Sequence, residues 1–187
     1  MPLAGLPLAG VALGLTLSAA LSAVLLAARE RAGDVLLWLM GHLGGARWAE
    51  VGAVAACLAA GGGLLASKAS ELNAFLLGEE VAASLGVAVE RMKARVLLAT
   101  ALLVAGAVAF TGLIGFIGLV VPHAVRLATG ADHRRLLPVA ALVGATTLIL
   151  ADLGARSLIT GELPVGIITG ALGGPFFLVL LRRSLRR

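Results

Sequence analysis

Few side chains in this chain could take part in chemistry, and the most suggestive of them are an acid and a base four positions apart. Asp152 and Arg156 have the i, i+4 spacing at which a carboxylate and a guanidinium pair on one face of a helix. One interpretation is a local ion pair at the end of a helix. The other is an arginine that faces an acidic partner. From the residues alone we favour the local ion pair.

The histidines and a glycine-rich stretch do not have the spacing of a metal, nucleotide or catalytic site. His42, His123 and His133 stand in three different segments, without a ligand pattern such as HxxxH. The stretch GGGLLASK, residues 61–68, lacks the Gly-Lys-Ser/Thr ending of a phosphate-binding loop, and no strand is predicted before it. No Ser-His-Asp arrangement or catalytic pair of carboxylates emerges. We therefore expect a chain that is not an enzyme and that binds no metal or cofactor.

The composition places the elements that carry these residues in a membrane. Hydrophobic residues make up 60% of the 187 residues and charged residues 13%, against about 25% charged in a soluble domain. The mean hydropathy is +1.05, which excludes a water-soluble globular domain. Tyr is absent and Trp occurs twice, which argues against stacking on nucleic acid, and the single Cys57 cannot form an intramolecular disulfide. We expect an all-α integral membrane protein that contacts lipid and binds no nucleic acid.

The apolar runs predict a polytopic helix bundle with about six transmembrane helices. A transmembrane helix needs about 20 apolar residues, and the runs cover residues 3–28, 51–67, 96–111, 113–125, 136–151 and 163–181. No basic residue precedes the first run, so we expect a true span rather than a cleaved signal. Gly112, Gly115 and Gly118 predict the turn between the third and fourth runs. The alternative is five spans with a re-entrant fourth segment.

The basic residues predict the orientation of the six spans. Of the 15 Lys and Arg residues, 11 fall on the side that holds both termini and 4 fall on the other side. The smaller group is Arg29, Arg31, Arg47 and Arg156. Lys and Arg concentrate in short cytoplasmic loops. We therefore expect both termini to be cytoplasmic.

The outer connection, residues 29–50, is too short to span a membrane but has a helical pattern. Its apolar residues Val35, Leu36, Leu39, Met40 and Leu43 recur at helical spacing. One interpretation is a short amphipathic outer helix. A tight, packed connection that closes the bundle is the other, and the pattern does not decide between them.

The longest inner loop, residues 68–95, has the pattern of two short helices. The segments 71–77 and 79–85 are each ended by a glycine, Gly78 and Gly86. In the second segment Val81, Ala82 and Leu85 fall on one face. Glu79 and Glu80 stand at its positive end, where a helix favours anions. We favour a docking surface for a cytoplasmic partner over a helix pair that lies against the bilayer.

The last apolar run has a regular pattern of small residues. Gly166, Gly170 and Gly174 recur every four residues, which lets helix backbones approach closely in lipid. Pro164 precedes the run and Pro175 lies near its middle, where it would bend the helix or interrupt its hydrogen bonds. Ordinary helix packing and a path-lining or dimer-contact role both fit the pattern. Since broken helices are common at transport paths, this is the span we expect to face one.

Four motifs give the chain a resemblance to a known family. LLGEEVAASLGV, GLIGFIGLVVPHAVRLATGADHRRLLP, ADLGARSL and ELPVGIITGALGGPFF occur in this order. From about Leu8 to the C-terminus the chain resembles the FecCD-type permeases, the membrane subunits of bacterial ABC importers for iron-siderophore, haem and cobalamin compounds. The resemblance implies a homodimeric permease in the bacterial inner membrane, two cytoplasmic ATPase subunits that use ATP, and an external substrate-binding protein. Among the substrates we favour an iron chelate, with haem and cobalamin behind.

The chain departs from the family in its number of helices. Members usually have ten membrane helices per subunit, whereas residues 1–187 form one FecCD-type domain with six. The chain therefore resembles the C-terminal part of a permease, as a fragment, a truncated product or half of a split protein. The alternative function is that of a truncated, non-conducting membrane protein with a structural or regulatory role.

The resemblance also implies roles for particular residues. Residues 78–86 match the family's cytoplasmic coupling helices, and Arg156 matches an outer arginine that pairs with a glutamate of the binding protein, which reverses our preference for a purely local ion pair. The residues expected at the ATPase contact are Gly78, Glu79, Glu80, Val81, Ala82, Leu85 and Gly86. The first and last spans match helices beside the translocation path. His123 and Arg126 match the family's PHxxR pattern, to which we assign only a structural role at the inner end.

Overall fold

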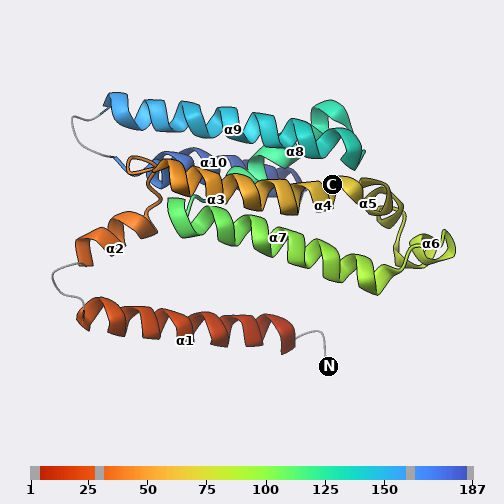
Figure 1. The fold of residues 1–187 in the computed structure, drawn as a ribbon, viewed down its shortest axis with the longest axis horizontal. Helices are drawn as coiled ribbons and strands as arrows, with labels where there is room; N and C mark the ends of the chain where they lie inside the picture. The colour runs from red at the N-terminus through yellow and green to blue at the C-terminus, as the bar shows by residue number, and fades with distance from the viewer. Residues whose placement is uncertain (1–4, 28–31, 159–162, 185–187) are drawn as a thin grey trace. The chain divides into compact units, whose positions relative to one another are not determined.

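The computed structural model describes residues 5–27, 32–158 and 163–184, which form two compact units. The first unit, Met1–Leu39, contains α1 (Gly5–Ala27) and α2 (Ala32–Leu39) (Figure 1). With 23 uncharged residues and a rise of about 1.5 Å per residue, α1 is about 34 Å long, enough to cross the hydrocarbon layer. The hydroxyls of Thr16 and Ser22 donate to carbonyls one turn earlier, so neither is left unsatisfied in lipid.

The second unit, Met40–Arg187, is helical throughout its described residues. Its elements are α3 (Trp48–Cys57), η2 (Leu58–Gly62), α4 (Gly63–Ser67), α5 (Ala69–Phe75), α6 (Glu79–Ser84), α7 (Val89–Thr111), α8 (Ile117–Thr129), α9 (His133–Leu158) and α10 (Val165–Ser184). The first three form one continuous rod in which η2 is a π-helical segment. This rod packs along α7, whereas α8, α9 and α10 pack on one another (Figure 1).

The rod and α7 approach closely at two glycines. A Cβ added at Gly106 of α7 would lie 2.8 Å from the Sγ of Cys57, and one added at Gly61 would lie 2.8 Å from the Cγ of Leu103. Glycine is therefore needed on both helices where they cross. The π-helical segment contains Gly61, so the local change in helix geometry coincides with this crossing.

The predicted class, an all-helical membrane bundle, is confirmed. Within the residues that the structure describes, four helical segments are long and apolar enough to cross a membrane: Gly10–Ala27, Trp48–Ser67, Val89–Thr111 and His133–Ser157. The apolar parts of α8 and α10, Ile117–Thr129 and Val165–Phe176, are shorter. Since α8 has 13 residues, it is about 20 Å long, less than the thickness of the hydrocarbon layer. The six-span count stays a prediction that depends on these two helices.

Two boundaries of the predicted spans differ from the structure. The third helix begins at Val89 rather than at residue 96, because the charged turns before the apolar run are helical as well. The fourth begins at Ile117 rather than at residue 113, because residues 112–116 form the turn. In that turn Gly112 has φ 68° and Phe116 has φ 66°, which is rare for a residue with a side chain.

The outer connection combines a helix and an irregular segment. The helix α2 ends at Leu39, and the predicted helical pattern is wrong for Met40 and Leu43. Gly41 has φ 77°, a conformation that ends helices. Directly after it, the backbone N–H of His42 donates to the carbonyl of Thr111 at the end of α7, 2.9 Å away. This bond fixes the segment that follows Met40 to the bundle.

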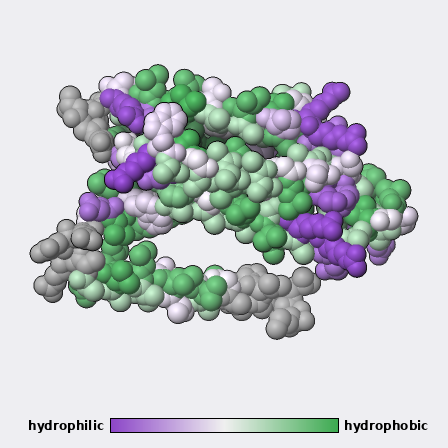
Figure 2. Space-filling view, viewed as in Figure 1, coloured by the Kyte–Doolittle hydropathy of each residue, from purple (hydrophilic) through white to green (hydrophobic). Residues whose placement is uncertain are grey.

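Few large apolar side chains of the second unit are buried in a core. The buried cluster consists of Val121, Val125 and Leu136, where α8 packs on α9. Along the three span candidates of this unit no more than 11% of the residues are buried. Figure 2 accordingly shows apolar surface along the helices of this unit and hydrophilic groups at their ends. Such a surface suits lipid or further protein rather than water.

Candidate functional site

The predicted pair of short helices is present between α4 and α7. The backbone at Gly78, with φ 106°, turns the chain from α5 into α6, and the Gly78 carbonyl accepts the first helical bond of α6 from Ala82. At the other end Gly86, with φ 85°, donates to Ala83 while Val87 donates to Ala82, both at 3.0 Å, the pair of bonds that defines a Schellman motif. Glycine is required at both positions because side chains disfavour these φ values. The loop is therefore a folded element.

The apolar face of α6 differs from the predicted one. Val81 is 43% exposed and Leu85 is 64% exposed, but Ala82 is 0% exposed. Ala82 consequently packs inside the chain, and its predicted place on the exposed face is wrong. The turn between α5 and α6 also exposes two leucines, and we call the exposed apolar residues of the loop, Leu76, Leu77, Val81 and Leu85, the loop patch. Figure 2 shows apolar atoms at this end of the unit, beside hydrophilic ones.

The two glutamates at the start of α6 have different environments. The Nζ of Lys93 in α7 lies 2.7 Å from the Oε2 of Glu79 and 3.2 Å from the Oε1 of Glu90. The same ammonium lies 5.9 Å from the ring centroid of Phe75 in α5. Lys93 thus connects α7 to both short helices. Glu80 is exposed, and within the described part of the chain it has no ion-pair partner.

A second polar contact joins α5 to the start of α9. The Nδ2 of Asn73 donates to the Oδ1 of Asp132 at 2.5 Å, and the Oδ1 of Asn73 accepts from the backbone N–H of His133 at 2.8 Å. The Nδ1 of His133 lies 2.8 Å from the same oxygen. Nearby, the Nη2 of Arg134 donates to the Oγ of Ser70 at 2.7 Å. We call these five residues the α5–α9 cluster.

Asp132 also caps α9. Its Oδ1 accepts from the backbone N–H of Arg134 at 3.0 Å, and its carbonyl accepts from Leu136 at 2.8 Å, as expected of an N-cap. The hydrogen bond from Asn73, with the backbone bond from Arg134, holds the pKa of Asp132 below its usual range. This cluster is not among the residues predicted from the sequence. Asp132, two residues after Gly130 and directly before a helix, could have been predicted as an N-cap from the sequence. The sequence around Asn73 gives no sign that Asn73 contacts it.

The basic residues gather at the end of the unit that carries the loop. This end, which we call the basic end, holds Lys68, Arg91, Lys93, Arg95, Arg126, Arg134 and Arg135, at or near the end of α4, the start of α7, the end of α8 and the start of α9. Arg126 lies in the last turn of α8, where a cation is favoured by the helix dipole, and His123 is half-buried one turn earlier. The loop patch is therefore an apolar surface within a basic region.

At the opposite end the predicted ion pair is present. The Nε of Arg156 lies 2.8 Å from the Oδ2 of Asp152, one turn earlier on α9. The side chain of Arg156 is 59% exposed, so its two terminal nitrogens remain accessible to solvent. Next to the pair is a small cavity of about 40 Å³ that His42, Gly44 and Leu163 also line. The geometry fits both a local ion pair and an arginine available to an external acid.

The three glycines predicted to form a stripe on α10 differ in how closely other atoms approach them. Pro164 is buried just before the helix, and a Cβ added at Gly166 would collide with the backbone carbonyl of Met40. Gly170 and Gly174 have no atom within 4 Å of an added Cβ among the described residues. A close contact that the sequence analysis missed is that of Gly173, which packs on the side chain of Phe116. The four-residue spacing predicted a close contact at Gly174, whereas the contact is made by the preceding residue, Gly173.

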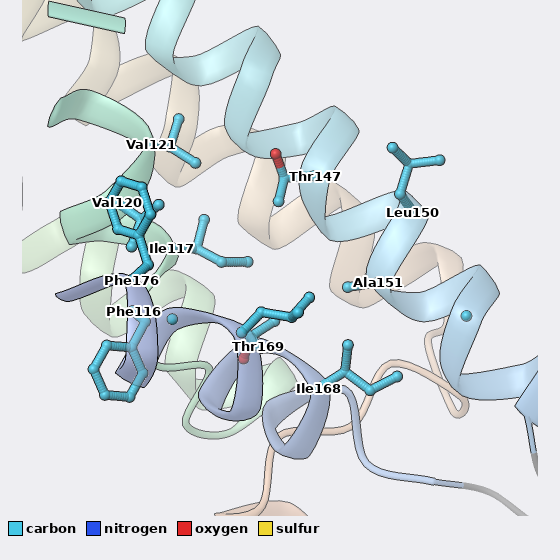
Figure 3. Close-up of a pocket in the computed structure, with 13 residues that line it drawn as sticks. Phe116, Ile117, Val120, Val121, Thr147, Leu150, Ala151, Ile168, Thr169 and Phe176 are labelled. Carbon is cyan, nitrogen blue, oxygen red and sulfur yellow. The ribbon is translucent and has the colours of Figure 1, made fainter. Parts of the chain in front are cut away.

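A cavity of about 530 Å³ lies between α8, α9 and α10 (Figure 3). Ile117, Thr147 and Thr169 face it from the three helices. The hydroxyls of both threonines donate to carbonyls of their own helices, at 2.7 Å for Thr147 and 3.2 Å for Thr169. The remaining lining is apolar, so the cavity presents no charged group that could bind a chelate. Gly170 and Gly174 do not line it and stand on a different face of α10.

Within the described residues, no group of three His, Cys, Asp or Glu side chains could hold a metal ion. His42 follows α2, His123 lies in α8 and His133 begins α9, so the three histidines are on separate elements. The arrangement offers contact surfaces and braced helices rather than a reactive centre.

Comparison with known proteins gives one consistent family. The model of the FecCD transport family matches residues 2–183. The chain is 48% identical over 181 residues to the cobalamin import system permease protein BtuC of Halobacterium salinarum, covering 97% of the chain and 49% of that protein. It is 45% identical over 184 residues to the hemin transport system permease protein HmuU of Yersinia pestis, covering 97% of the chain and 55% of that protein. The chain thus spans about half the length of these curated relatives.

A solved structure has the same fold. It is described as an inward-facing conformation of an ABC transporter of the metal-chelate type, and the chain is 35% identical to it with a TM-score of 0.88. The superposition covers 97% of this chain and 60% of that one. The helix arrangement described above is therefore one that occurs in a solved transporter.

Proposed function

The chain belongs to the FecCD transport family, and from this premise we propose that it is a permease subunit of an ATP-driven ABC importer. The feature that carries the proposal is the folded α5–α6 loop at the basic end, which contains the family motif LLGEEVAASLGV and exposes the loop patch. A folded loop that is anchored to both α7 and α9 can transmit a displacement, whereas a flexible tether cannot. The chain itself carries out no bond chemistry.

The proposed partner at the loop patch is a separate cytoplasmic ATPase subunit, which binds and hydrolyses the ATP. A groove on the ATPase would bury Leu76, Leu77, Val81 and Leu85, at about 25 cal/mol per Å² of apolar area. Glu80 is exposed and can meet a basic residue at the rim of that groove, which sets orientation more than affinity. Glu79 is already held by Lys93, so we assign it an internal role.

The proposed orientation places the basic end and both termini in the cytoplasm. Lys and Arg favour the cytoplasmic side, and an ATPase partner requires the loop to be there. The complete importer then contains two permease copies, two ATPase subunits and an external binding protein at the Arg156 end, all in a cytoplasmic membrane. The relatives include proteins of Halobacterium salinarum and Yersinia pestis, so a bacterial origin stays a prediction.

The proposed substrate class is iron chelates, haem or cobalamin, with iron chelates favoured. Relatives carry names for each: the cobalamin and hemin permeases described above and the Fe(3+) dicitrate transport system permease protein FecC of Escherichia coli, which is 36% identical over 182 residues. Within the second unit we assign the path to the open face of α10 that bears Gly170 and Gly174, because no described atom lies within 4 Å of an added Cβ there.

Transport by the assembled importer tests this function. The chain is co-expressed with its cognate ATPase and binding protein, reconstituted in vesicles, and supplied with labelled ferric siderophore, haem and cobalamin. We expect ATP-dependent uptake of one of the three and none with a non-hydrolysable ATP analogue. An intact assembly that takes up none of them would contradict the transport function and favour the structural or regulatory alternative.

Arg156→Glu is expected to weaken docking of the external binding protein by about five- to tenfold at low salt, and by less at high salt, because exposed ion pairs are screened. The affinity of the binding protein for vesicles containing the importer measures this. The matched control is Asp152→Asn, which frees the Arg156 guanidinium from its 2.8 Å contact and is expected to keep or strengthen docking. If both variants behave like the parent protein, Arg156 is only the partner of Asp152.

A further inference from the structure

Two sets of polar contacts hold the α5–α6 loop: one joins it to α7 and the other joins it to the start of α9. The Lys93–Glu79 pair connects residues 14 apart in sequence, and its side chains are 41% and 57% exposed. An ion pair with this much exposure contributes little to the stability of one particular geometry. The bonds of Asn73 connect residues 59 and 60 apart. Asp132 is exposed too, but Asn73 and His133 are half-buried, and the second bond comes from the backbone N–H of His133, whose position the helix fixes. The contact with α9 is therefore the one that fixes where the loop stands relative to this helix.

The amide of Asn73 can occupy only one orientation in this site. Its Nδ2 faces the carboxylate of Asp132, an acceptor, and its Oδ1 faces the backbone N–H of His133, a donor. Exchanging the two ends would set oxygen against carboxylate and N–H against N–H, which loses both bonds and adds two repulsions. The contact consequently specifies a single position of α5.

A displacement of α5 must act on the first turn of α9. Asn73 bonds the cap residue Asp132 and the first helical residue, His133, and the same carboxylate holds the backbone N–H of Arg134. From there α9 runs 26 residues, about 39 Å, toward the end that carries Asp152 and Arg156, and it packs against both α8 and α10. No other described hydrogen bond or ion pair between side chains connects α5 or α6 to α8, α9 or α10, apart from the adjacent Arg134–Ser70 bond.

We propose that Asn73 is the positioning residue that transmits displacement of the α5–α6 loop to α9, through its paired bonds to Asp132 and His133. This inference rests on the proposed function, because the ATPase supplies the displacement. The loop patch binds the partner, and the α5–α9 cluster converts the partner's movement into movement of α9. Binding and transmission are thus assigned to different residues of one loop.

The test is a pair of variants that breaks and then restores the same contact. Asn73→Asp sets a second carboxylate against Asp132. The double variant Asn73→Asp/Asp132→Asn exchanges the partners, so that residue 73 accepts from His133 and from the new amide, while the amide oxygen at residue 132 still caps α9. Each variant is assembled with its ATPase and binding protein. The measurements are ATPase co-purification, basal ATP hydrolysis, stimulation by the loaded binding protein, and uptake.

For Asn73→Asp we expect full co-purification and basal hydrolysis within about twofold of the parent, because the loop patch is untouched. Stimulation and uptake should fall at least tenfold, and the double variant should recover most of both. Unchanged uptake in Asn73→Asp, or no recovery in the double variant, would overturn the proposal. If Asn73→Asp inserts poorly, Asn73→Ala makes the same test without the added charge. A parent assembly that binds no ATPase would instead contradict the proposed function.

Discussion

Leu85→Asp is expected to release the cognate ATPase from the chain while leaving the chain inserted in the membrane. Leu85 follows directly after α6, belongs to the loop patch with 64% of its surface exposed, and lies outside every candidate span. Burying a leucine contributes about 1.5–3 kcal/mol, and an unpaired carboxylate at the same contact adds a desolvation cost. Since each 1.4 kcal/mol is a factor of ten in affinity, we expect a loss of at least about a hundredfold.

Co-purification of the ATPase with the tagged chain from membranes measures this loss. Ala83→Asp is the matched control, because it places the same charge at an exposed position of α6 that lies about 200° around the helix from both Val81 and Leu85. We expect it to retain the ATPase. Full retention by a stably inserted Leu85→Asp variant would falsify the docking role and favour a loop that lies against the bilayer.

The choice of Leu85 over Ala82 depends on the structure. The sequence predicts where the two short helices end, because Gly78 and Gly86 are local signals of left-handed backbone. It cannot predict which side of a six-residue helix faces inward, because the apolar positions of so short a segment fit either side. Ala82 has a place in the apolar pattern yet is fully buried, so Ala82→Asp would damage the loop itself.

Contacts between residues far apart in the sequence are the ones that the sequence alone does not predict. The Asp152–Arg156 pair is predictable because its spacing of four is a property of any helix. The Asn73–Asp132 bond joins two segments that only the packing of α5 on the start of α9 brings together. No periodicity connects them, and an asparagine in a polar loop has many local explanations.

The length of the fourth span illustrates a different limit. Residues 113–125 are apolar enough to suggest a helix, but Gly112 and Phe116 both adopt positive φ, so the helix starts only at Ile117. Positive φ is expected of glycine but not of phenylalanine. Phe116 adopts it where its side chain packs on Gly173 of α10, so the helix boundary depends on a residue 57 positions later in the sequence.

The glycines of α10 lead to the second large expected effect: Gly166→Ala is expected to destabilise the chain, whereas Gly170→Ala is not. An added methyl group at Gly166 meets the backbone carbonyl of Met40, which cannot turn away as a side chain could. The Gly166 N–H also donates to the Gly41 carbonyl at 3.4 Å, so a shift of α10 would weaken a bond as well. Overpacking of this kind costs about 1–3 kcal/mol, which for a chain of this size lowers the melting temperature by several degrees.

Gly170 is the matched control because it lies one turn later on the same helix, with no described atom within 4 Å of an added Cβ. There the substitution removes the conformational cost of glycine in a helix, about 0.5–1 kcal/mol, so the melting temperature should stay the same or rise. Thermal unfolding of the detergent-purified variants, followed by circular dichroism, measures both. Equal melting temperatures for Gly166→Ala and Gly170→Ala would contradict the close contact between Met40 and α10. If the melting temperature falls only in Gly170→Ala, another helix packs against the face that we assign to the transport path.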